Sequence, residues 1–305
     1  MKAVVLAGGL GGSRFARALA EALDPRDVTV VGNVGDDLEI AGLHVSPDLD
    51  TILYTLAGVL DEERGWGRAG ETWNARETAT ELGGETWFQL GDRDLGLHLA
   101  RTEALRGGES LSAVTGRLSR AFGVEATLLP ATDDRLRTWV ATPAGEFPFQ
   151  EWFVHRGHRD EVDGVRFDGA EEARPAPGVL EALGAADLIA IAPSNPFLSI
   201  GPILAVAGIR EAIEHRAVPA VAVSPLIGGR TVRGPADRML ARLAGGTAPA
   251  QVASCYKGLI DALVIDEEDA DHADEAEVRT IVTRTFMRDA EARRRLAEAV
   301  LGVPV

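Results

Sequence analysis

Residues Val4–Arg14 read Val-Val-Leu-Ala-Gly-Gly-Leu-Gly-Gly-Ser-Arg, and this run of residues sets the type of fold. The apolar residues predict a buried strand, the glycines predict a tight loop, and Ser13 and Arg14 open an amphipathic stretch that predicts a helix. Glycine lets the backbone approach a ligand closely because it has no Cβ. The loop N–H groups and the positive end of the helix would then bind an anion, with Arg14 adding a charged contact. We therefore expect a phosphate-binding loop made of Gly8, Gly9, Gly11, Gly12, Ser13 and Arg14.

This glycine-rich stretch does not by itself identify the ligand. No Gly-Lys-Ser or Gly-Lys-Thr follows it, so it is not a P-loop, and its spacing is not a clean Gly-x-Gly-x-x-Gly dinucleotide fingerprint. Sugar-nucleotide pyrophosphorylases begin in a similar way but continue with Pro-Leu-Thr and Pro-Lys segments that this chain lacks. A strand-to-helix turn that uses glycine only for packing stays as the alternative.

Composition and charge exclude several classes of protein. The 305 residues are 46% hydrophobic and 26% charged, which is ordinary for a soluble globular protein of one or two domains. No apolar run approaches the ~18 residues that span a bilayer. The net charge of −16 comes without a basic stripe, which argues against a nucleic-acid partner. The lone cysteine, Cys255, excludes an internal disulfide, and together with an N-terminus that enters a strand at once it favours a cytoplasmic protein.

Short apolar runs alternate with helical patterns at both ends of the chain. We expect strands at Ala3–Ala7, Val28–Gly32, Leu188–Ala192 and Ala220–Ser224, and helices at Gly11–Leu23, Asp48–Leu60, Gly201–His215 and Asp289–Val300. Such alternation is typical of an α/β, Rossmann-like, doubly wound fold with a mainly parallel sheet, here as a single domain over residues 1–305. Ligands of these folds bind beyond the carboxyl ends of the strands.

The middle of the chain has a different pattern, and we interpret residues 62–176 as an inserted lid or subdomain of helices and β-hairpins. It holds β-like stretches near Arg137–Ala141 and Phe147–Val154 and a helical stretch at Leu95–Arg106. Further along, Asp266–Glu277 is strongly acidic, and we expect a solvated surface loop there.

Four carboxylates follow the second predicted strand: Asp36, Asp37, Asp48 and Asp50. Since carboxylates repel phosphate, their use beside a phosphate is to hold a hard cation such as Mg²⁺. Asp48 could instead belong to the first turn of a helix after Ser46 and Pro47, and Asp36 with Asp37 could form a turn. We favour Asp36 and Asp50 as metal ligands, and Asp50 or Asp48 as the candidate general base.

Other loops at the ends of predicted strands carry polar side chains suited to ligand binding. Gly91, Asp92, Arg93 and Asp94 precede a helical stretch, where a helix cap with a salt bridge is the alternative. The remaining candidates are Asn33, Ser194, Asn195, Pro196 and Ser224. The six histidines show no metal-ligand spacing.

Collinear blocks along nearly the whole chain resemble the 2-phospho-L-lactate transferases of deazaflavin coenzyme biosynthesis. The matching blocks are Gly8–Gly12, Asn33–Asp37, Ser46–Thr51, Leu90–Asp94, Leu128–Pro130, Phe149–Trp152, Ala192–Pro196, Ser199–Ile203 and Ser224–Pro225. Gly65–Gly67 and Glu71–Ala75 are most similar to the bacterial branch of the family, which uses phosphoenolpyruvate.

The resemblance implies a Mg²⁺-dependent homodimer that transfers a 2-phospho-L-lactyl or phosphoenolpyruvyl group from a guanosine diphosphate donor. The acceptor would be 7,8-didemethyl-8-hydroxy-5-deazariboflavin, GMP would leave, and the product would be coenzyme F-420-0 or its dehydro form. By the same resemblance, Gln89 and Asp50 lie where the family contacts the deazaflavin. Archaeal members carry Lys at the position of Gln89, so this chain lacks that charge.

Two other functions stay open. A distant branch of the same superfamily, the gluconeogenesis regulators, resembles a non-catalytic nucleotide or UDP-sugar-binding protein. A sugar-1-phosphate nucleotidyltransferase is suggested only by the first fourteen residues.

Overall fold

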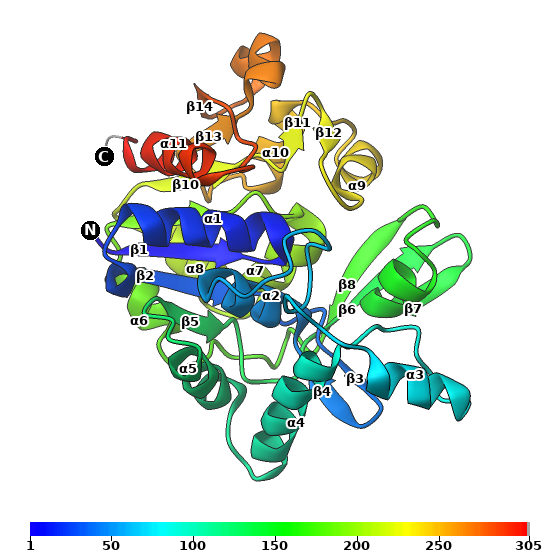
Figure 1. The fold of residues 1–305 in the computed structure, drawn as a ribbon. Coiled ribbons are helices and arrows are strands. Elements are labelled where there is room, and N and C mark those ends of the chain that lie inside the picture. Colours follow the sequence, from blue (N-terminus) through cyan, green and yellow to red (C-terminus); the bar gives the residue numbers. More distant parts are fainter. Residues whose placement is uncertain (304–305) are drawn as a thin grey trace.

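The computed structural model describes residues 1–303, and its centre is a seven-stranded parallel sheet in the order β14-β13-β10-β9-β1-β2-β5 (Figure 1). The strands are β1 (Ala3–Ala7), β2 (Val28–Gly32), β5 (Thr127–Pro130), β9 (Leu188–Ile191), β10 (Ala220–Val223), β13 (Ala262–Ile265) and β14 (Arg279–Val282). The chain winds outward from β1 through β2 to β5, then returns to β9 and winds the other way. The α/β doubly wound prediction is confirmed, and the strand order reverses between β1 and β9.

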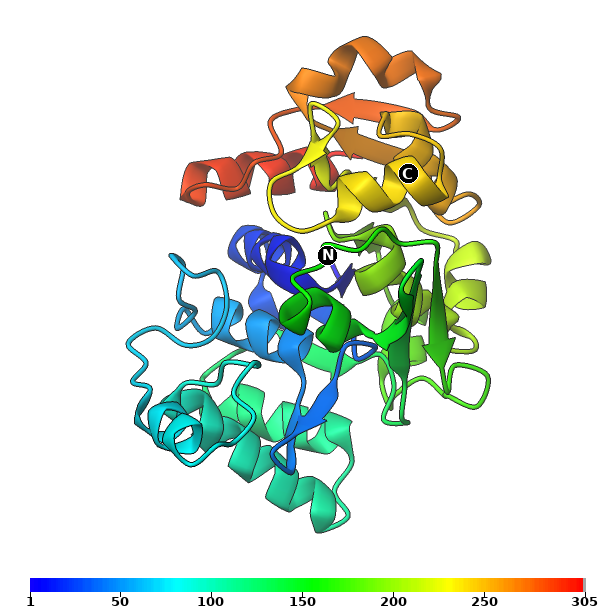
Figure 2. The same ribbon diagram turned by 90° about the vertical axis from the view of Figure 1, so that its right-hand side faces the viewer.

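Helices cover both faces of this sheet. On one face α1 (Gly9–Ala22) packs against α2 (Pro47–Leu56) and α11 (Ala290–Leu301). On the other face α8 (Ile209–Glu214) packs against α6 (Val179–Gly184) and α7 (Gly201–Ala205), as Figure 2 shows along the strands. Buried on both sides, strands such as β1 are apolar at every position, which explains the runs of Val, Ile, Leu and Ala in the sequence.

Smaller elements lie at the carboxyl ends of the strands (Figure 2). One group is helical, with α3 (Asn74–Glu81) and α4 (Asp92–Arg106) beside the hairpin of β3 (Leu38–Ile40) and β4 (Leu43–Val45). A second group is the antiparallel sheet of β6 (Arg137–Thr142), β7 (Gly145–Pro148) and β8 (Gly164–Asp168), with the π-helical turn η2 (Glu151–His155). The remaining elements, not all of which lie at this edge, are β11 (Leu226–Ile227), β12 (Arg230–Thr231), α5 (Leu111–Ala121), α9 (Ala236–Leu243), α10 (Pro249–Cys255), η1 (Pro25–Asp27), η3 (Pro196–Ile200) and η4 (Glu267–Glu275).

The range 62–176 is not one continuous insertion, because β5 pairs with β2 inside the central sheet. Within residues 62–176, the segments before α5 and after β5 lie outside the central sheet, one on each side of β5 in the sequence. The lid expected from the sequence therefore corresponds to two separate segments of the chain.

Several predicted elements differ from those in the structure. The helix expected at Gly201–His215 is broken into α7 and α8, because Val206 leaves the helical conformation with ψ 124°. The strand expected at Phe147–Val154 ends at Pro148 and continues as η2, which buries Trp152. The acidic segment after β13 forms the 3₁₀ turns of η4, with Asp269 buried.

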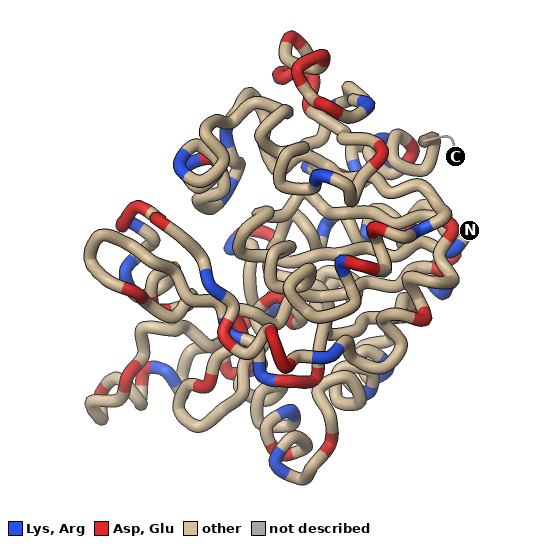
Figure 3. Tube along the Cα trace, turned by 180° about the vertical axis from the view of Figure 1, so that it is seen from behind, with Lys and Arg blue, Asp and Glu red and all other residues tan. Residues whose placement is uncertain are grey.

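Acidic and basic residues are interspersed along the trace, with acidic residues gathered on η4 (Figure 3). Within residues 1–303, no helix is long and apolar enough to cross a membrane.

Candidate active site

A cavity of about 830 Å³ opens at the carboxyl ends of the central strands, at the point where the strand order reverses between β1 and β9. Loops after β1, β2, β9 and β10 line it together with α2, η2 and the segments before α4 and α9. Of the residues predicted from the sequence, the cavity is lined by Gly8, Gly9, Gly11, Arg14, Asp36, Asp48, Asp50, Gln89, Asp94, Ser194, Asn195 and Ser224. The sheet topology therefore brings most of the separate candidate loops to one place.

The other predicted residues lie behind or beside the cavity lining. Gly12 packs its backbone against Ala7 and Ser194, and the Ser13 hydroxyl donates to the Leu10 carbonyl. Pro196 is buried, and Asn33 lies beneath the lining. The loops predicted from the sequence thus meet at one cavity, but some of their residues shape the loop rather than face the cavity.

Asp92 has a structural role in the Gly91–Asp94 segment. Its carboxylate accepts hydrogen bonds from the backbone N–H groups of Asn74 and Ala75 at 3.1 Å, so it caps α3. The Thr72 hydroxyl and these donors hold the pKa of Asp92 down at about 2. Arg93 donates to the Ala69 carbonyl at 3.3 Å, so only Asp94 of this segment reaches the cavity. Asp92 thus acts as a helix cap, but of α3 rather than of the helical stretch that follows it, for which the cap was expected.

The glycine loop is tied to β9 and α2. The Ser194 hydroxyl donates to the Gly8 carbonyl at 2.8 Å, and the Gly9 N–H donates to Asp48 Oδ1 at 2.7 Å. Gly9 has φ 65°, which favours glycine, and α1 begins at this residue. A Cβ on Gly11 would lie 2.6 Å from the Pro193 carbonyl oxygen, so α1 and the β9 loop meet there backbone to backbone.

Asp36 and Asp48 form a buried carboxylate pair at the wall of the cavity. The Asn33 amide lies between them and donates to Asp36 Oδ1 at 3.2 Å and to Asp48 Oδ2 at 2.9 Å. Burial, then the neighbouring charges of Asp48 and Asp37, raise the pKa of Asp36 well above its ordinary value. Burial also raises the pKa of Asp48 to about 6, against the lowering effect of hydrogen bonds from Asn33 and Gly9. Within residues 1–303, no Lys, Arg or His forms an ion pair with either carboxylate.

This carboxylate pair fits a Mg²⁺ ion. Two buried carboxylates with raised pKa values carry their negative charges at an electrostatic cost. A divalent cation between or beside them lowers that cost. Mg²⁺ in nucleotide enzymes is usually held by one or two carboxylates, with substrate phosphates and waters completing its shell. In keeping with so small a protein contribution, the described part of the chain has no group of three or more His, Cys, Asp or Glu arranged to hold a metal.

Asp50 differs from the expected metal ligand. Its Oδ2 accepts from Arg101 Nη1 at 3.0 Å and its Oδ1 accepts from Arg101 Nη2, so both oxygens have a cationic partner. The Asp50 carboxylate is therefore already neutralised, whereas Asp36 shares the Asn33 amide with Asp48. Among the described residues Asp36 and Asp48 are the two cavity carboxylates held by the Asn33 amide, while the expectation that Asp36 and Asp50 bind the metal stays a prediction.

His98 and Asp94, in this part of the wall, both have pKa values shifted by burial toward their neutral forms. Burial lowers the pKa of His98 to about 4, so its imidazole is neutral. Burial raises the pKa of Asp94 to about 6, with the charges of Glu71 and Asp50 acting in the same direction. Asp94 Oδ1 is buried and accepts no hydrogen bond.

Replacing Asp94 by Asn should stabilise the protein above pH 6. Because the folded-state pKa of about 6 exceeds the unfolded value, the carboxyl favours folding below pH ~4 and loses that contribution as the pH rises through 6. Asn carries no such charge, so the variant should gain up to about 3 kcal/mol at pH 7. Thermal melts of both proteins from pH 4 to 8 measure this: the difference in Tm should be near zero at pH 4 and grow with pH. A difference that does not change with pH would contradict it.

Aromatic side chains form another part of the cavity wall. Phe149 and Phe153 stack with ring centroids 5.2 Å apart and planes 23° apart, and Gln150 between them donates to the Asp36 carbonyl at 3.2 Å. At the mouth, Trp66 is 38% exposed and Phe286 is 44% exposed, although both are large apolar residues. A cavity lined by carboxylates, a glycine loop and aromatic rings suits a ligand with a flat ring system and a phosphate.

Sequence reasoning missed the residues that hold the outer loops of the cavity. Asp269 accepts from the Gly228 and Gly229 N–H groups at 3.1 and 2.8 Å, and Asp266 accepts from the Thr285 N–H at 2.7 Å. The acidic segment is thus partly an anchor for cavity loops rather than only a solvated surface. Arg233 Nη1 donates to the Arg64 carbonyl at 2.7 Å and joins two loops across the cavity mouth. Nothing in the sequence spacing pairs these residues, which come from different parts of the chain.

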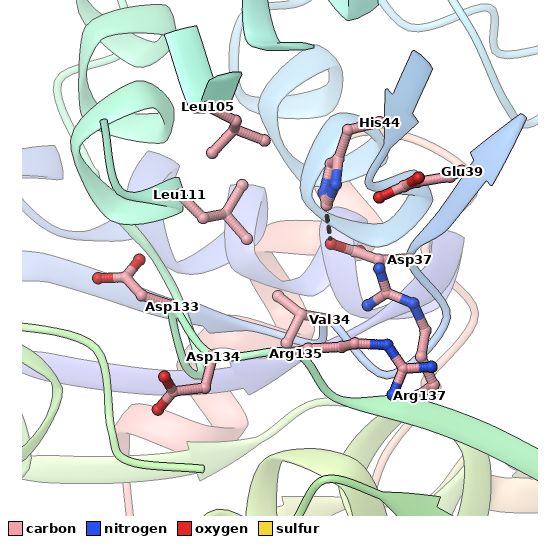
Figure 4. A pocket seen from close by; sticks show the side chains of 10 residues that line it. All are labelled: Val34, Asp37, Glu39, His44, Leu105, Leu111, Asp133, Asp134, Arg135 and Arg137. Atoms are coloured by element: carbon pink, nitrogen blue, oxygen red, sulfur yellow. Dashed lines mark hydrogen bonds and ion pairs between the residues drawn. The ribbon is translucent and has the colours of Figure 1, made fainter. Parts of the chain in front are cut away.

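A smaller cavity of about 490 Å³ lies on the other side of the Asp36–Asp37 turn (Figure 4). There Asp37 Oδ2 accepts from the Ser46 hydroxyl at 2.8 Å and lies 3.1 Å from His44 Nε2. The two adjacent aspartates therefore face different cavities, and only Asp36 belongs to the large one.

The model of the family described as 2-phospho-L-lactate transferase CofD matches residues 3–303. The chain belongs to this family. It is 46% identical over 310 residues to a phosphoenolpyruvate transferase of Streptomyces griseus, covering 99% of this chain and 98% of that protein. It is 39% identical over 325 residues to a phosphoenolpyruvate transferase of Mycolicibacterium smegmatis, with coverage of 99% and 98%.

A solved structure of a UPF0052 family member from Bacillus halodurans has a similar fold. Its TM-score is 0.65 at 18% identity, and the match covers 98% of each chain. At that identity the likeness concerns the fold alone. Membership of the transferase family, by contrast, rests on the sequence matches along nearly the whole chain.

Proposed function

We propose that this transferase moves a phosphoenolpyruvyl group from a guanosine diphosphate donor to 7,8-didemethyl-8-hydroxy-5-deazariboflavin. GMP would leave, and the product would be the dehydro form of coenzyme F-420-0. The relatives named phosphoenolpyruvate transferase, at 39–46% identity over nearly their full length, support this choice of transferred group over 2-phospho-L-lactate.

The observation that carries the proposal is the composition of the large cavity. It joins the glycine loop, the buried pair of Asp36 and Asp48, and the aromatic wall of Phe149 and Phe153 in one space of about 830 Å³. Transfer of a phosphoryl-type group depends mainly on positioning and on neutralising charge. The glycine loop would bind the donor phosphates, and the aromatic wall would pack against the flat deazaflavin.

Asp36 and Asp48 would hold Mg²⁺ beside the donor phosphates. When bound, Mg²⁺ supplies the positive charge that offsets the negative charge of the phosphates during transfer. The Asn33 amide keeps the two carboxylates together, and Asp50 presents its carboxylate to the cavity, where it could accept a hydrogen bond from the attacking ribityl hydroxyl. His98, neutral beside Asp50, adds no competing positive charge.

Incubation of the purified protein with Mg²⁺, the deazaflavin and the enolpyruvyl guanosine diphosphate donor tests the proposal by mass spectrometry. We expect GMP and a deazaflavin that carries a phosphoenolpyruvyl group. The lactyl donor serves as the matched comparison. Turnover of that donor alone would mean that the chain transfers the 2-phospho-L-lactyl group instead. Binding of a UDP-sugar without turnover of either donor would instead favour the regulator.

Size-exclusion chromatography with light scattering tests the homodimer that we propose from the family resemblance.

A further inference from the structure

Arg101 is the most deeply buried charged side chain near the cavity, with 1% of its surface exposed. It comes from the middle of α4 and does not line the cavity, whereas its partner Asp50 does. Both terminal nitrogens of the guanidinium contact the two oxygens of Asp50, which is the bidentate arrangement that fixes a carboxylate most firmly. Arg101 thus acts on the ligand space through the cavity residues that it contacts, chiefly Asp50.

Stability alone is a poor explanation for this ion pair. Taking a guanidinium and a carboxylate out of water costs several kcal/mol per ion, and an apolar pair of similar volume often stabilises a protein as well or better. In addition, Arg101 Nε has no hydrogen-bond partner. Arg101 Nη1 also lies 3.4 Å from His98 Nδ1, so the guanidinium borders a second residue that faces the cavity.

The backbone gives Asp50 no comparable support. Asp48, two residues earlier, is fixed by the Gly9 N–H and by Asn33, but the Asp50 carboxylate accepts its hydrogen bonds from Arg101. Catalytic groups act efficiently when neighbouring groups hold them in the productive orientation before the substrate arrives. Without the two guanidinium nitrogens of Arg101, the Asp50 carboxylate would be free to rotate or to turn toward the cation site of Asp36 and Asp48.

We propose that Arg101 is a positioning residue that holds the Asp50 carboxylate toward the acceptor-binding part of the cavity and away from the metal carboxylates. The inference rests on the proposed function, because it assigns Asp50 to the hydroxyl of the acceptor. Neither the sequence spacing nor the resemblance assigned a role to Arg101.

A double-mutant cycle of Arg101→Lys and Asp50→Asn tests the inference. Lys keeps the positive charge but has one nitrogen, so it loses the bidentate geometry. Arg101→Lys should lower kcat about 30-fold while KM for the donor changes less than about threefold. In the Asp50→Asn background the same substitution should change kcat less than about threefold, because Arg101 then has no carboxylate to orient. Thermal melts should show each variant folded at the assay temperature.

Arg106→Lys on the same helix is the matched control, since Arg106 is exposed and donates to the Gly42 carbonyl. It should leave kcat unchanged. Equal losses from Arg101→Lys in both backgrounds, or a loss that follows Tm alone, would overturn the positioning role while leaving the transferase proposal intact.

If the parent protein shows no turnover, that result counts against the proposed function. The double-mutant cycle is then repeated with the affinity for the deazaflavin as the measured quantity, followed by the fluorescence of the deazaflavin. The same non-additivity should appear in Kd, and additivity there would overturn the inference. A parent that neither turns over nor binds the deazaflavin would contradict both.

Discussion

Replacing Asp36 by Asn should lower kcat about 1000-fold and leave the metal-free protein no less stable at pH 7. In the proposed site, Asp36 supplies half of the protein's negative charge toward Mg²⁺, and losing such electrostatic stabilisation costs about 4 kcal/mol of the activation barrier. The raised pKa of Asp36 means that its charged form is unfavourable in the folded protein. The neutral Asn should therefore match the parent in Tm at low pH and exceed it as the pH rises.

Two measurements separate this outcome from a simple loss of structure. Mg²⁺ titrations followed by thermal melts should raise the Tm of the parent and leave that of Asp36→Asn nearly unchanged. Asp133→Asn is the control, because Asp133 accepts from the Ser112 N–H at 2.6 Å and lies beside the small cavity instead. An Asp36→Asn protein that keeps parental kcat, or that still gains Tm with Mg²⁺, would remove Asp36 from the metal site.

Replacing Gly11 by Ala should abolish donor binding and destabilise the protein. The new Cβ would lie 2.6 Å from the Pro193 carbonyl oxygen, closer than real Cβ atoms come, and the obstacle is backbone rather than a side chain that can rotate. Either α1 or the loop after β9 must move, and both line the cavity. We expect a destabilisation of about 2 kcal/mol or more, which is typical of overpacking, and at least a 100-fold weaker affinity for GDP by calorimetry.

Gly96→Ala is a matched control within a helix of the same chain. Gly96 lies inside α4, and a Cβ there would meet no atom within 4 Å. Because Ala favours the helix over Gly, this variant should be about 0.5–1 kcal/mol more stable than the parent and bind GDP equally well. If Gly11→Ala behaved like Gly96→Ala, close packing of the glycine loop on the Pro193 backbone could not be a requirement for binding.

Four of the seven strands of the central sheet, β1, β2, β9 and β10, could be predicted because their signal is local. β1 and β2 have the predicted bounds, and β9 and β10 end one residue earlier than predicted. Each is an apolar run that ends in a turn residue. A strand that is buried on both faces needs apolar residues at successive positions, so the run itself predicts the strand. The edge strand β5 and the break between α7 and α8 were not predicted, because they depend on packing partners far along the chain.

The candidate site was predictable to the level of loops but not of partners. The alternation of strands and helices places the loops after β1, β2 and β9 at one edge, so Gly8, Asp36 and Ser194 meet without further information. Which carboxylate faces which neighbour is a different question. Asp36 and Asp37 are adjacent in sequence yet face two cavities, because the turn that carries them points successive side chains in different directions.

The doubly wound fold, the glycine loop and the family follow from residue types at short or collinear spacings, so they can be predicted without coordinates. Which partner groups hold each aspartate depends on the tertiary structure. Asp48 is held by Gly9 across 39 positions and Asp50 by Arg101 across 51 positions. A buried carboxylate takes its charge state and direction from the groups packed around it, and those groups come from distant segments that only folding brings together.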